Sequence, residues 1–236
     1  PIHTVSAPSP EEIVKAAFGR HLRDDIKAKT VQRLLPCIID RSAIPPDIER
    51  RCFGRALRLN TLKTSSEQEK MLETACAVIR YNLYTKNKED YTVGLEEDCK
   101  NRDYLYGRLL AVADRVEMLA LTKPWETPKR VKTRATNAVR YMQRFSRLPC
   151  STWKFLYVDK LHSSYFPQLG ERSGRYERLI QDIKSLFEHG DYVSDKPLTG
   201  EFLLGYHCQQ KAFRDRAKLN TGNKPQPVNE DNEEDT

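Results

Sequence analysis

The sequence lacks the segments that mark several large classes of protein. No apolar run approaches the roughly 18 residues that a membrane span needs, and the first residues form neither a signal nor a transit peptide. The six cysteines are scattered without a CxxC pair, which argues against a disulfide framework and a zinc site. We therefore expect a soluble, cytoplasmic protein that uses no cofactor.

Signatures of catalytic sites are equally scarce. The HExxH, GxSxG and Walker patterns are absent, and so is the three-glycine dinucleotide fingerprint. The five histidines are isolated, and the His207-Cys208 pair falls in an apolar stretch that is typical of a core. We expect no catalytic residue and no metal site, and we interpret the chain as a non-enzyme.

Strand patterns are missing as well, whereas helix signals recur. Alternation of apolar and polar residues is nowhere convincing, but Ser9 with Glu12 and Ser65 with Gln68 form capping boxes. We predict an all-α fold, an antiparallel helical bundle with a preceding helical segment. After the helix that follows Ser9, helices are expected near 24–40, 46–59, 65–85, 102–121, 128–147, 150–166, 174–189 and 199–217.

The chain divides by composition into three regions. Residues 1–100 are predicted to be a helical connecting region, 101–217 a C-terminal helical bundle, and 218–236 a disordered acidic tail. The chain begins at Pro1 without an initiator Met, so we expect a fragment of a longer protein. Apolar residues at helical spacing predict one bundle core of Leu105, Leu109, Val112, Val116, Val131, Met142, Phe145, Leu179, Ile183, Leu186, Phe202, Leu203, Tyr206 and Phe213.

Acidic residues are entirely missing from residues 127–147, and this is the most informative absence. The segment 123–147 carries eight bases and one acid, a net charge of +7 that equals the formal net charge of the whole chain. On a helical wheel one face, opposite Met142 and Phe145, carries the cations Lys129, Lys132, Arg140, Arg144 and Arg147, and one flank carries Arg130, Arg134 and Tyr141. An amphipathic helix with a purely cationic polar face is predicted.

Three interpretations of this face are open: nucleic-acid backbone binding, contact with an acid-rich protein, or a solvated surface. Solvated faces usually mix charges of both signs, and arginine outnumbers lysine five to two in 127–147, which suits bidentate phosphate contacts. We favour nucleic-acid binding. The residues predicted to bind are Lys129, Arg130, Lys132, Arg134, Arg140, Tyr141, Arg144 and Arg147.

Several segments together resemble one known family. NRDYLYGRLLAVADRVE, PKRVKTRATNAVRYMQRF, GRYERLIQDIKSLFE and PLTGEFLLGYHCQQKAF resemble, in that order, the C-terminal half of the large subunit of the type I-C CRISPR surveillance complex, Cascade, a Csd-type family. Upstream, SAPSPEEIVKAAFG and KTVQRLLPCIIDRSAIPPDIERRC resemble the segment that precedes it. The resemblance covers nearly all of residues 5–215 and rests on the ordered set, since no single motif is as specific as a metal signature.

The resemblance implies a helical bundle within an RNA-guided DNA-binding complex. Its implied partners are the guide RNA-containing complex, the backbone subunits, the displaced strand of target DNA, and a recruited helicase-nuclease. The family part that reads the PAM, the short DNA motif beside the target, precedes this region. The resemblance also implies that a small subunit can be made by internal translation, beginning at Met118, at Met71 or at a non-Met codon. A piece that begins at Met118 is expected to be a folded but less stable bundle.

Three hypotheses follow for the function. The first is a bundle that supports the displaced DNA strand in a CRISPR complex. In the second, the chain is a helical scaffold whose basic helix docks partner subunits without direct DNA contact. The third is an unrecognised nuclease.

Overall fold

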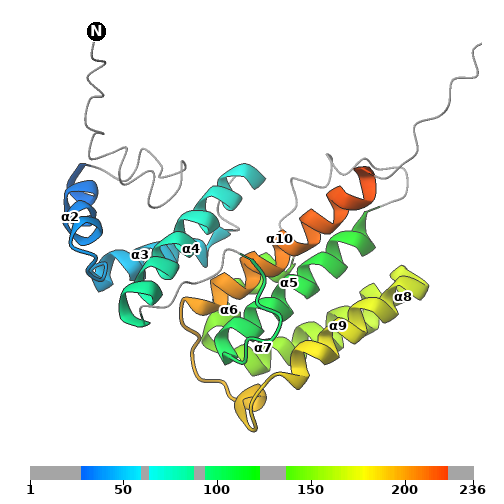
Figure 1. Ribbon diagram of the computed structural model, residues 1–236. Helices are drawn as coiled ribbons and strands as arrows, with labels where there is room; N and C mark the ends of the chain where they lie inside the picture. Colours follow the sequence, from blue (N-terminus) through cyan, green and yellow to red (C-terminus); the bar gives the residue numbers. More distant parts are fainter. Residues whose placement is uncertain (1–27, 60–63, 88–93, 123–136, 223–236) are drawn as a thin grey trace, which may run out of the picture.

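The computed structural model describes residues 28–59, 64–87, 94–122 and 137–222 (Figure 1). These residues form helices and connecting turns without any strand, which confirms the predicted all-α class. The helix expected after Ser9 lies outside the described residues. The α-helices are α2 Ala28–Ile39, α3 Pro46–Ala56, α4 Ser65–Asn87, α5 Arg102–Leu121, α6 Asn137–Arg147, α7 Pro149–Phe155, α8 Phe166–Leu169, α9 Ser173–Ser185 and α10 Glu201–Gly222.

Helices α5 and α10 lie side by side at the centre of the bundle (Figure 1). The side chain of Asn101 caps α5 by accepting hydrogen bonds from the backbone N–H groups of Asp103 and Tyr104, at 2.9 and 3.0 Å. Most of α5 is buried on all sides, as expected for a helix with apolar residues around its whole circumference. Helix α9 packs against α5, and α4 packs against α10, so the central pair holds the remaining helices together.

The predicted core is largely confirmed. Within it, Leu179, Leu186 and Phe213 are partly buried and pack against the main cluster, while Val131 lies outside the described residues. The fully buried members are Leu105, Leu109, Val112, Val116, Met142, Phe145, Ile183, Phe202, Leu203 and Tyr206.

The main core also includes side chains from before residue 100, the boundary proposed from the sequence. Ala56, Leu72, Cys76 and Ile79 join the same cluster as α5 and α10. A separate small cluster of Leu34, Ile44, Ile48 and Val78 fills the space between α2, α3 and α4. The helical segment that precedes the bundle therefore packs directly onto it through α4.

Several helix boundaries differ from those expected. The expected helix 150–166 is divided into α7, a π-helical segment η3 (Leu156–Tyr165) and α8. In the π-helical segment residues five apart share a face, and the rings of Tyr157 and His162 meet edge to face at 4.6 Å. Short 3₁₀ turns, η4 (Gly170–Arg172) and η5 (Asp191–Val193), flank α9. Helix α10 ends at Gly222, beyond the expected residue 217.

Among the described helices, none combines the length and apolar character that crossing a membrane would require.

Candidate nucleic-acid interface

Helix α6 is fixed to the bundle by its apolar face. Met142 and Phe145 are completely buried. The Phe145 ring stacks on Phe202 of α10 at 5.6 Å and meets the edge of Tyr106 of α5 at 5.7 Å. These contacts confirm the apolar side predicted from the helical wheel. They determine which way the opposite face of α6 points.

The opposite face of α6 carries exposed arginines. Arg140, Arg144 and Arg147 are all exposed, and none forms an ion pair with any residue that the structure describes. The three lie at spacings of four and three residues, so their side chains follow one stripe of the helix. Three positive charges are therefore held on one side of a helix whose other side is locked in the core.

Of the other residues predicted to bind nucleic acid, the structure describes only Tyr141. Lys129, Arg130, Lys132 and Arg134 lie outside the described residues. Tyr141 is half-buried, and its ring meets the edge of the Phe155 ring at 5.4 Å. The described structure thus brings Arg140, Arg144 and Arg147 together and uses Tyr141 partly for packing.

Two residues beside α6 were missed from the sequence. The Phe155 ring at the end of α7 lies under two cations: the guanidinium carbon of Arg144 is 5.9 Å from the ring centroid, and Lys160 Nζ is 5.6 Å from it. Cations over an aromatic face are attracted by its quadrupole. Phe155 therefore gathers Arg144 and Lys160 into one patch, although they come from different elements. The sequence spacing of five residues between Phe155 and Lys160 gives no signal on an α-helical wheel.

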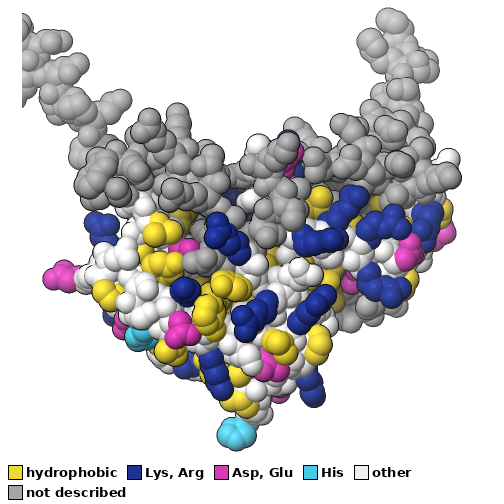
Figure 2. Space-filling model, turned by 180° about the vertical axis from the view of Figure 1, so that it is seen from behind, with side chains coloured by type: hydrophobic (Ala, Val, Ile, Leu, Met, Phe, Trp, Pro, Cys, Tyr) yellow, Lys and Arg dark blue, Asp and Glu magenta, His cyan; other side chains and the backbone are white. Residues whose placement is uncertain are grey.

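Basic side chains are not confined to α6. Figure 2 shows lysine and arginine side chains spread over one face of the molecule, with fewer acidic side chains among them. On α9, Lys184 Nζ lies 5.0 Å from the ring centroid of Tyr192 and 5.8 Å from that of Tyr157. The α6 stripe remains distinctive because residues 127–147 contain no acid.

Titratable groups elsewhere do not assemble a metal site within the described part of the chain: no group of three or more His, Cys, Asp or Glu side chains is placed to hold a metal ion there. His207 and Cys208 are both buried, as predicted for core positions. Burial, together with the nearby positive charges of Arg80, Arg214 and Lys211, lowers the pKa of His207 to about 4. Its Nδ1 atom has no hydrogen-bond partner among the described residues.

A comparison with known protein families shows to which family this helical bundle belongs. A family model described as CRISPR-associated protein (Cas_Csd1) matches residues 1–214. The chain belongs to the Csd1 family. The match includes α2 to α9 and most of α10, so the basic face of α6 and the central helix pair are both parts of a Csd1 domain. The search of curated proteins found no match for this Csd1 chain.

Proposed function

We propose that this Csd1 chain is the C-terminal region of the large subunit of a type I-C Cascade complex, where it supports the unwinding of target DNA. In this role the bundle is non-catalytic. It contacts the phosphates of the displaced strand and touches the neighbouring backbone subunits of the guide RNA-containing complex. The complex in turn recruits the helicase-nuclease that degrades the target.

The observation that carries this proposal is the stripe of Arg140, Arg144 and Arg147 on a helix anchored from behind by Met142 and Phe145. Guanidinium groups suit phosphates because their planar donors can form two parallel hydrogen bonds. A rigid helix also loses less conformational entropy on binding than a loop that becomes ordered. The stripe is thus suited to the backbone of an extended strand.

Weak contacts are sufficient for this task. Exchanging DNA pairing for guide pairing is close to balanced in free energy, so modest protein contacts to the freed strand shift the equilibrium towards the open state. Contacts to phosphates carry no sequence information. A surveillance complex that must accept many targets needs this kind of support.

The half-burial of Tyr141 favours a second candidate function. A ring that packs against Phe155 offers less of its face for stacking on a base, and single-strand binders commonly combine charge with stacking. A scaffold role, in which the α6 arginines dock an acidic partner subunit, uses the charge alone. The two functions predict different behaviour of the isolated chain.

A gel-shift and cleavage assay of the full chain separates the hypotheses. Two unrelated single-stranded oligonucleotides of equal length are incubated with the chain, with and without magnesium, at several salt concentrations. If the bundle supports the displaced DNA strand, it should bind both oligonucleotides weakly and with equal affinity, the binding should weaken as salt rises, and neither oligonucleotide should be cleaved. No shift at low salt would favour the scaffold, and magnesium-dependent products would establish the nuclease.

A further inference from the structure

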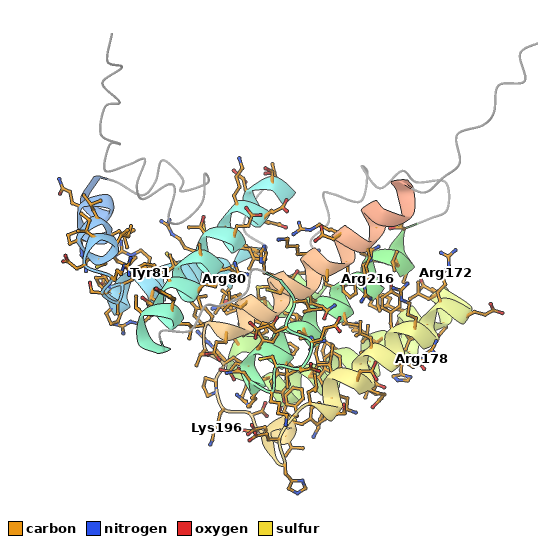
Figure 3. All side chains as sticks on the ribbon, viewed as in Figure 1. Arg80, Tyr81, Arg172, Arg178, Lys196 and Arg216 are labelled. Carbon is orange, nitrogen blue, oxygen red and sulfur yellow. The ribbon has the colours of Figure 1, made fainter. Side chains whose placement is uncertain are left out.

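A second group of arginines lines a groove of about 680 Å³ whose lining includes no residue of α6. Helices α5, α9 and α10 form it, together with the segment that precedes α5. Figure 3 shows Arg178 extending from α9 and Arg216 from α10. The cationic and aromatic side chains of the lining are Arg108, Arg115, Arg175, Arg178, Arg216, Tyr176 and Phe213.

Two of these arginines are already engaged. Arg108 is buried and donates hydrogen bonds to the backbone carbonyls of Glu96 and Glu97, at 3.4 and 2.7 Å. Arg216 Nη2 lies 3.8 Å from Glu97 Oε1. Both help to hold the segment before α5 against the bundle. They account for only part of the positive charge in the groove.

The charges of the remaining arginines are not neutralised by ion pairs with the residues that the structure describes. Arg115 and Arg175 form no ion pair with any residue in the described ranges, and Arg178 uses Nε to donate to the Gly174 carbonyl at 3.2 Å. The lining contains five arginines against the three acids Glu97, Asp98 and Asp182, a difference of +2. The side walls include the rings of Tyr176 and Phe213, whose centroids are 6.4 Å apart. An anionic ligand with some apolar surface fits this combination.

We propose that the groove binds an acidic peptide, and that its occupant is residues 223–236 of the same chain. Five acids, Glu230, Asp231, Glu233, Glu234 and Asp235, stand against one base in this segment, Lys224. Its net charge of −4 is opposite in sign to that of the groove.

The connection between groove and segment makes this contact local. Phe213, Arg216 and Ala217 of α10 line the groove, and the helix ends at Gly222, about 9 Å further along at 1.5 Å per residue. Residues 223–236 follow directly and, extended, span up to about 45 Å. A tether of this kind supplies an effective concentration on the order of millimolar, so weak individual contacts suffice.

The acids within the groove favour a peptide over a nucleic acid. A nucleic-acid strand places a charge on every nucleotide and meets Glu97, Asp98 and Asp182 wherever it crosses the lining. A peptide can place its carboxylates at the arginines and its uncharged residues at the acids. The α6 stripe differs in this respect, because its segment contains no acid at all.

Zero-length carbodiimide cross-linking of the full chain tests the proposal. Arg175→Lys and Arg178→Lys keep the positive charge and introduce amines that couple to carboxylates in direct contact. We expect mass spectrometry to find cross-links from these amines to the acids of 230–235, independent of protein concentration and lost at about 1 M salt. The matched control is Arg55→Lys, which places an amine at an exposed position of α3.

Three outcomes would overturn the proposal. The first is the absence of these cross-links, or an equal yield at the Arg55→Lys control, since either shows that the segment has no preference for the groove. The second is photochemical cross-linking of a thymidine oligonucleotide to Tyr176 without carboxylate cross-links, which would assign the groove to nucleic acid. The third comes from replacing the five acids by their amides: this should speed hydrogen exchange in α9, and unchanged exchange would contradict the proposal.

Discussion

Gly107 of α5 and Gly205 of α10 lie where the two central helices cross, each facing the backbone of the other helix. A Cβ atom on Gly107 would lie 2.0 Å from the carbonyl oxygen of Phe202, and one on Gly205 would lie 1.9 Å from that of Tyr104. Real Cβ atoms do not approach backbone so closely. Both positions therefore need glycine so that the central pair can pack at this distance.

The first prediction concerns this crossing. Gly107→Ala and Gly205→Ala should each lower the free energy of unfolding by about 1 to 3 kcal/mol, because the helices must move apart and lose packing. This loss is expected to exceed the gain of up to about 1 kcal/mol from the better helix propensity of alanine. Urea denaturation followed by circular dichroism measures both.

Gly174 of α9 provides the matched control. It is helical, and a Cβ atom there meets nothing within 4 Å. Gly174→Ala should leave the stability unchanged or raise it slightly. Equal effects of the three substitutions would show that the close approach of α5 and α10 is not what requires glycine.

The second prediction is a pH dependence that arises from His207. The pKa of this buried histidine is about 4 in the folded state, against an ordinary value of 6.5. As the pH falls, His207 therefore binds a proton at a higher pH in the unfolded chain than in the folded chain. The contribution of neutral His207 to the free energy of unfolding is fully present above pH 6.5 and is lost towards pH 4. The loss from this residue is on the order of 3 kcal/mol.

The comparison with His207→Leu isolates this effect, because carboxylates titrate near the lower end of the same range in both proteins. The difference in unfolding free energy between the two should change with pH only from about 6.5 to about 4. A difference that is constant over this window would show that His207 is not held neutral by the fold.

The third prediction concerns internal translation products. From the sequence, a piece beginning at Met118 was expected to be a folded but less stable bundle. The structure leads to a different expectation, because Met118 lies near the end of α5 and the piece would lack Tyr106, Leu109 and Val112 from the centre of the core. We now predict that it does not fold alone, whereas a piece beginning at Met71 keeps α5 and folds.

Thermal denaturation of the two pieces, followed by circular dichroism, tests this expectation. A cooperative transition should appear only for the longer piece. A cooperative transition of equal midpoint in the Met118 piece would mean that the remaining helices form a core without the centre of α5.

The helices and the core could be predicted because they depend on local patterns. Leu105, Leu109, Val112 and Val116 repeat at three and four residues, and all four are buried as this spacing predicts. The buried face of α6 followed from the same periodicity. One sequence is enough for such features, since each helix must bury its own apolar face.

Features that depend on contacts between elements could not be predicted. Residues 156–165 have no sequence signal for a π-helix, so Phe155 and Lys160 were not expected to share a patch with Arg144. The groove gathers Arg115, Arg175 and Arg216 from three helices that are far apart in the chain. Its existence depends on how α5, α9 and α10 pack.

The salt dependence of single-stranded DNA binding by the full chain tests whether the α6 arginines contact phosphates. Arg140, Arg144 and Arg147 are changed together to Glu, and fluorescence anisotropy gives the affinity at several salt concentrations. The matched control makes the same charge change at Arg50, Arg51 and Arg55 of α3, which are also exposed.

If the α6 arginines contact phosphates, each contributes about 0.7 to the slope of log affinity against log salt, so the triple substitution should reduce the steepness of that slope by about two. The affinity should fall equally for unrelated sequences, the helical spectrum should be retained, and the α3 variant should keep the original slope. An unchanged affinity and slope in the α6 variant would show that these arginines do not contact DNA, and would identify this face as a protein-docking surface.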